Sequence, residues 1–151
     1  MPRFIFFVLV CMVIAIPVYN KITTLKTVNA SLIGNVAMRG YDPVELKTNH
    51  HLLAGAEEYE TVYSGAKWRF VTELNQAHFQ LTPNNYMPQF GGYCAYGVAE
   101  GYLADGNPKQ WVIANNKLYF FFSEGQKALW NQNQNILQQQ AHRQWPKITN
   151  K

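Results

Sequence analysis

Short apolar segments on either side of small turn sequences form the clearest pattern along the chain. One pair of segments surrounds Ser64-Gly65, and a second pair surrounds Asn115-Asn116. Gly and Asn accept the left-handed backbone that a two-residue turn between antiparallel strands requires. The pattern therefore predicts two β-hairpins, over residues 61–71 and 111–122.

A helical pattern follows each predicted hairpin. Thr72 is a capping residue before a helix that begins at Glu73, and Ser123 with Gln126 forms a capping box before a long helix. We expect this second helix to run through Trp145 and to stop at Pro146. The expected apolar faces are Leu74, Ala77, His78 and Leu81 in the first helix, and Leu129, Ile136, Leu137, Ala141 and Trp145 in the second.

The remaining local signals are shorter. Asp42-Pro43 marks a turn, residues 45–58 are typical of a loop, and residues 93–99 fit one or two helical turns closed by Gly101. No internal repeat is visible. We expect an α+β fold, with a small antiparallel sheet built from the two hairpins, flanking helices and a long C-terminal helix.

The N-terminus has the pattern of an export or anchoring segment. Phe4 to Tyr19 is an almost unbroken apolar run preceded by Arg3. As a helix it would be roughly 24 Å long, shorter than a bilayer core of about 30 Å. Residues 1–19 therefore predict a signal peptide or an N-terminal membrane anchor, followed by a linker over 20–32 and a domain over 33–151. The domain would therefore lie outside the cytoplasm, either in the periplasm or anchored to the membrane and facing its extracytoplasmic side.

Charge and cysteine content narrow the function classes. The net charge is +4, from 13 basic and nine acidic residues, but the basic residues are scattered rather than clustered. A nucleic-acid surface needs clustered cations, so nucleic acid is excluded as a partner. The two cysteines exclude a disulfide-rich scaffold and a four-cysteine zinc site. Beyond the N-terminal segment, Cys94 is the one thiol.

Two sequence blocks carry a family resemblance: Gly40-Tyr41-Asp42-Pro43-Val44, and Gly91-Gly92-Tyr93-Cys94-Ala95-Tyr96-Gly97. Together with Trp68-x-Phe70 and Trp145-Pro146, they make residues 34–148 similar to the exported YHS domain-containing (seleno)proteins. Most members of that family have no assigned activity. The resemblance implies a metal site, because shorter YHS domains accompany copper-transporting ATPases. In those domains cysteines follow the Asp-Pro-Val and the aromatic strand, whereas this chain has Glu45 and Val71-Thr72 there.

Cys94 is the candidate centre of a site. In a first helical turn, free backbone amides would stabilise its thiolate, which is both a nucleophile and a soft metal ligand. We expect copper or zinc bound by Cys94 with His78, or a small ligand bound by Cys94, Tyr93, Tyr96, Tyr41 and Asp42. The tyrosines fit an aromatic core equally well, and a free cysteine is often a small buried hydrophobe.

Three functions follow from these residues. The first is a binding module for a metal ion or a small molecule, centred on Cys94. The second is a thiol-redox enzyme that uses Cys94, and the third is a purely structural or interaction domain. Contact with a membrane is expected only through the N-terminal segment, and the sequence predicts no protein partner.

Overall fold

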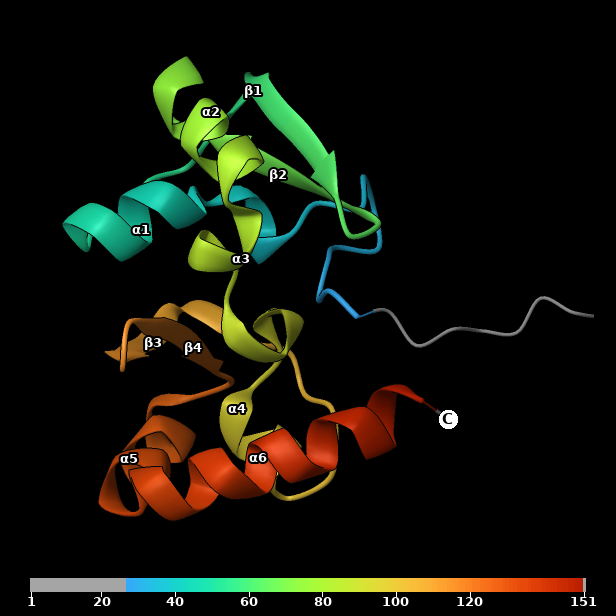
Figure 1. The fold of residues 1–151 in the computed structure, drawn as a ribbon, viewed down its shortest axis with the longest axis vertical. Helices are drawn as coiled ribbons and strands as arrows, with labels where there is room; N and C mark the ends of the chain where they lie inside the picture. The colour runs from blue at the N-terminus through green and yellow to red at the C-terminus, as the bar shows by residue number, and fades with distance from the viewer. Residues whose placement is uncertain (1–26, 151) are drawn as a thin grey trace, which may run out of the picture.

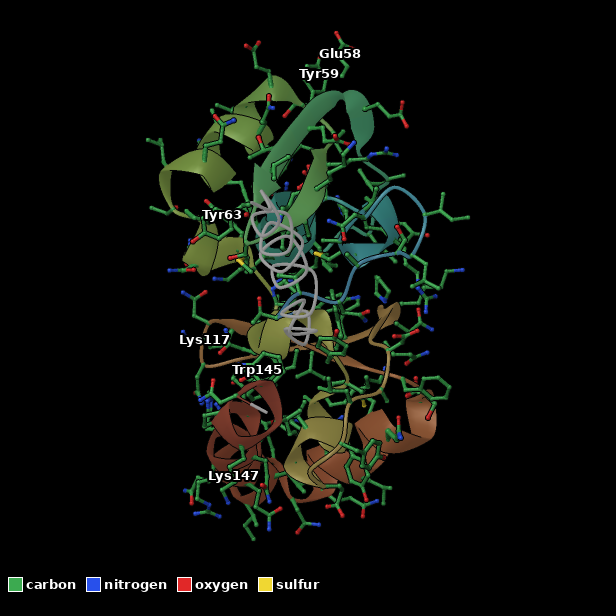
Figure 2. All side chains as sticks on the ribbon, turned by 90° about the vertical axis from the view of Figure 1, so that its right-hand side faces the viewer. Glu58, Tyr59, Tyr63, Lys117, Trp145 and Lys147 are labelled. Carbon is green, nitrogen blue, oxygen red and sulfur yellow. The ribbon has the colours of Figure 1, made fainter. Side chains whose placement is uncertain are left out.

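The computed structural model describes residues 27–150, which form two units stacked end to end (Figure 1). The first unit comprises a 3-10 turn, a helix, a hairpin and two more helices: η1 (Met38–Gly40), α1 (Pro43–Asn49), β1 (Ala56–Tyr63), β2 (Ala66–Phe70), α2 (Glu73–Leu81) and α3 (Pro83–Tyr86). The second unit comprises η2 (Gln89–Gly92), α4 (Ala95–Ala99), β3 (Asn107–Ala114), β4 (Lys117–Phe121), α5 (Glu124–Gln132) and α6 (Gln134–Thr149). In Figure 2, Glu58 and Tyr59 of β1 lie toward one end of the molecule, and Lys147 of α6 toward the other.

The α+β class, both hairpins and the long C-terminal helix are confirmed. Each hairpin turns through two left-handed residues, Ser64 and Gly65 in the first (φ 49° and 75°) and Asn115 and Asn116 in the second (φ 51° and 58°). The two hairpins do not pair with each other. They form two separate two-stranded sheets instead of one.

The order of elements in the first unit is repeated in the second, which the sequence did not predict. Pairing runs from Ala56↔Phe70 to Tyr63↔Ala66 in the first hairpin, and from Asn107↔Phe121 to Ala114↔Lys117 in the second. Both registers shift at the same place, after Ala56 and after Asn107. Phe70 and Phe121 are 51 positions apart (121 − 70), and the other paired positions match at the same spacing. The described part of the chain therefore contains two copies of one structural unit.

Each unit is built around its own aromatic core, and strand β4 contributes side chains to both cores. In the first core, Phe79 of α2 packs against Trp68 and Phe70 with ring centroids 5.1 Å apart. In the second core, Trp130 takes the corresponding place on α5. Alternate residues of β4 point to opposite cores: Leu118 and Phe120 to the first, Tyr119 and Phe121 to the second.

The predicted face of α2 is wrong. Leu74 and Leu81 are 63% and 79% exposed, His78 is also exposed, and Phe79 is the buried residue of this helix. The inward side is partly polar because Asn75 and Gln76 bond to the hairpin and to the start of α1. Hydrogen bonding, rather than apolar spacing, sets the rotation of the helix.

Three other features of the helices also differ from expectation. The helix expected to run from Ser123 to Trp145 is interrupted at Asn133, whose non-helical backbone (φ −135°, ψ 36°) separates α5 from α6. The interruption falls in an Asn- and Gln-rich run, and Asn is a poor helix former. Pro146 lies inside α6 instead of ending it. Residues expected as loop contain most of α1, which begins with Pro43 at its first position after the capping residue Asp42.

A short N-terminal strap, residues 27–31, lies across the doubled glycine. Val28 is buried, and the Asn29 amide donates to the Gly91 carbonyl at 2.9 Å. Gly91 and Gly92 both have left-handed φ, and a Cβ on Gly91 would collide with the Thr27 carbonyl oxygen. The fold thus extends to Val28, within the range expected as linker. The predicted signal peptide or anchor lies outside the described residues, and no helix of residues 27–150 is long and apolar enough to cross a membrane.

We predict that Gly91→Ala destabilises the fold by about 3 kcal/mol or more, because it adds a backbone collision to left-handed strain. Gly65→Ala is the matched control, since Gly65 is also left-handed but a Cβ there meets nothing within 4 Å. Its expected cost is about 1–2 kcal/mol. Urea unfolding measures both free energies, and equal losses would contradict the proposed close approach of the strap.

Candidate functional site

Asp42 is a buried connecting residue of the first unit. Its Oδ1 accepts hydrogen bonds from the amides of Val44 (2.7 Å) and Glu45 (3.0 Å), which caps α1. Its Oδ2 accepts from the Val71 amide and from Asn75 Nδ2, both at 2.8 Å. Four donors therefore surround a carboxylate that is fully removed from solvent. The bonds tie α1 to the end of β2 and to α2.

Cys94 occupies the corresponding position of the second unit. It precedes α4 as Asp42 precedes α1, and its amide donates to the Ala104 carbonyl as that of Asp42 donates to Leu53. The sulfur is fully buried and lies 3.4 Å from Gln126 Oε1, to which the thiol donates. Gln126 is the counterpart of Asn75, because both follow the capping Ser or Thr by three positions. Cys94 thus lies where the first unit has a structural carboxylate, and it makes one side-chain hydrogen bond in place of four.

The other predicted site residues lie in different parts of the molecule. Tyr41 packs against the first core and Tyr96 against the second. His78 is exposed on α2, in the unit that does not contain Cys94. Within residues 27–150, no group of three or more His, Cys, Asp or Glu side chains could hold a metal ion. Metal binding by Cys94 with His78 therefore stays a prediction, and these two residues lie in different units.

A pocket of about 420 Å³ opens where the strap meets the two units. We call it the junction pocket. One wall comes from the strap and the segment up to η1, and the other from the start of the second unit and from β4. Its lining comprises Asn29, Ala30, Ser31, Leu32, Val36, Met38, Arg39, Gly92, Tyr93, Asp105, Gly106 and Phe120. Of the predicted site residues, Tyr93 is the one in this lining.

Two charged residues of opposite sign line the junction pocket. Arg39 and Asp105 are both exposed, and neither forms an ion pair with another residue of the described chain. Arg39 and its neighbour Met38 have left-handed backbone, with φ of 54° and 51°. This conformation costs a residue with a Cβ about 1–2 kcal/mol. Its presence beside a pocket is typical of a position held for function as well as for folding.

Polar groups next to Asp105 complete the site. With the Asn29 amide oriented to satisfy both of its ends, its oxygen accepts from Gly106 N at 3.0 Å and its nitrogen donates to Asp105 Oδ1 at 3.3 Å. Burial raises the pKa of Tyr93, and the charge of Asp105 raises it further. Tyr93 therefore stays protonated and can donate a hydrogen bond at neutral pH.

Sequence reasoning missed Asn29, Arg39 and Asp105. No motif assigns them to a common site, because Asp105 lies far along the chain from Asn29 and Arg39 and meets them only after folding. The doubled glycine was a usable signal, since close backbone approach at Gly91 brings the strap to the pocket. Comparisons with protein-family models, curated proteins and solved structures find no match for this chain. The resemblance to YHS domain-containing proteins therefore stays a prediction.

We predict that Cys94 in the native protein reacts with iodoacetamide at least about a hundredfold more slowly than an exposed thiol, because labelling requires local opening. The reference is a cysteine introduced by Thr48→Cys on the exposed side of α1. Site-resolved mass spectrometry of the full chain measures both rates. Labelling of Cys94 at the reference rate would favour the thiol-redox interpretation over a structural one.

Proposed function

We propose that the protein is a binding module for a small ligand held in the junction pocket. The observation that carries the proposal is a preformed cavity that is lined by one guanidinium and one carboxylate, neither of them in an ion pair within the described chain. Its volume, about 420 Å³, is in the range of small-molecule sites. Such sites commonly lie between two packed units, where neither unit alone closes the cavity.

The lining favours a ligand with both an anionic and a donor group. The Arg39 guanidinium would pair with a carboxylate, in the two-pronged geometry that arginine favours. Asp105 would accept from an amine or a hydroxyl. Val36, Met38 and Phe120 supply an apolar wall. An apolar amino acid or a related small amphoteric molecule has this combination of groups.

Copper or zinc binding at Cys94, and thiol-redox chemistry there, stay predictions. Both would use a site different from the junction pocket. Each requires an accessible sulfur, whereas this one is fully buried and donates to Gln126. A metal ion would have to replace that contact and recruit ligands from elsewhere. The same residues fit a structural role for Cys94, so the junction pocket is the better supported site. We also propose that the protein functions outside the cytoplasm, because its N-terminal segment has the pattern of an export or anchoring segment.

We predict that leucine or phenylalanine raises the melting temperature of the wild-type protein, since a ligand that binds only the native state stabilises it. Arg39→Asn and Asp105→Asn should each weaken binding about tenfold or more, because a hydrogen bond to a charged group contributes about 1.5–3 kcal/mol. Asn is chosen at position 39 because it accepts the left-handed backbone.

The matched control is Arg143→Gln, which removes an exposed cation on α6 outside the pocket. Hexanoate, which lacks the amine, should bind with the same dependence on Arg39 but no dependence on Asp105. Isothermal titration supplies the affinities. If neither amino acids nor hexanoate bind, or if all three variants behave alike, the proposal fails.

A further inference from the structure

A short loop beside the junction pocket exposes two aliphatic side chains almost completely to solvent. Leu32 and Ile33 are 97% and 92% exposed, more than any other large apolar side chain of residues 27–150. We call residues 31–35 the apolar tip. The next most exposed aliphatic residue, Leu81, reaches 79% at the end of α2. Adjacent aliphatic side chains exposed in this way are typical of an interaction site.

The apolar tip is held in place by hydrogen bonds. The Ser31 amide donates to the Val36 carbonyl at 2.9 Å, and Ser31 Oγ both donates to the Ile33 carbonyl and accepts from the Val36 amide. The Lys67 amide on β2 donates to the Asn35 carbonyl at 2.9 Å. The exposure of the two side chains is therefore built into the turn and is not a consequence of a loose segment.

The charges around the tip fit a phospholipid surface. No charged residue lies between Thr27 and Met38. Arg39 follows at once, and it lines the same pocket as Leu32. Aliphatic side chains bury in the acyl boundary of a bilayer, and the lack of charged residues on either side of this pair in the sequence favours that burial.

The position of the tip in the chain gives the second argument. The apolar run Phe4–Tyr19 is separated from Thr27 by seven residues, which can span at most about 25 Å. The start of the described chain and the apolar tip lie along the same edge of the molecule (Figure 1). A bilayer that holds the apolar run would therefore be within reach of the tip.

We infer that Leu32 and Ile33 insert into the interfacial layer of a phospholipid bilayer and give the domain a second membrane contact besides its N-terminal segment. This contact would hold the junction pocket beside the membrane surface. The inference does not depend on the ligand of the pocket, because it rests on the tip, on its charge pattern and on the connection to residues 4–19.

The test is photocrosslinking of the full chain in phosphatidylglycerol–phosphatidylcholine vesicles that contain a diazirine phospholipid. Mass spectrometry then locates the lipid adducts. We expect adducts on the peptide that contains Leu32 and Ile33. In the double variant Leu32→Asp/Ile33→Asp these adducts should fall about tenfold or more, because a carboxylate is costly to remove from water. Adducts within residues 4–19 should persist.

Leu74→Asp/Leu81→Asp is the matched control, since it introduces the same two carboxylates at exposed aliphatic positions of α2 in the first unit. It should leave the adducts at the tip unchanged. Adducts confined to residues 1–26, or adducts as frequent around Leu81 as around Ile33, would overturn the inference. The substituted side chains are exposed, so an unchanged melting temperature verifies that each variant is folded.

Discussion

The contact between the N-terminal strap and the doubled glycine is the constraint on which the rest of the molecule depends. Two backbones approach at Gly91 more closely than any residue with a Cβ would allow, and the Asn29 amide bonds to the Gly91 carbonyl. That approach places Val28 in the first core and Asn29 against the second unit. One wall of the junction pocket exists only because the strap is held there, so binding in the pocket and folding of the chain use the same contact.

The internal repetition explains why the residue that stands out in the sequence is not the residue that lines the pocket. Each unit has, just before its first helix, a buried side chain that hydrogen-bonds to the helix after the hairpin. The first unit uses Asp42 with four donors, and the second uses Cys94 with Gln126. A lone thiol next to two glycines suggests chemistry, but a carboxylate in the same place performs a structural task. The pocket instead forms between the strap, the segment up to η1 and the second unit.

Much of the fold could be predicted, because hairpin turns and helix caps are local. The Ser64-Gly65 and Asn115-Asn116 turns and the Thr72 and Ser123 caps are all present. The rotation of α2 could not be predicted, since it follows from Asn75 bonding to a carboxylate 33 positions away. The pocket could not be predicted either, because its charged residues meet only through the packing of the strap. The internal repeat is hidden because most equivalent positions carry different residues.

Hydrogen exchange of the Asn29 backbone amide tests this account most directly. If the strap is an integral part of the fold and forms a permanent wall of the pocket, this amide exchanges as slowly as the Cys94 amide, which donates to Ala104 inside the second unit. Measurement of both amides by NMR in the ligand-free protein gives the comparison. Exchange of the Asn29 amide near the rate of an unprotected peptide would show that the wall is not preformed and would contradict the account.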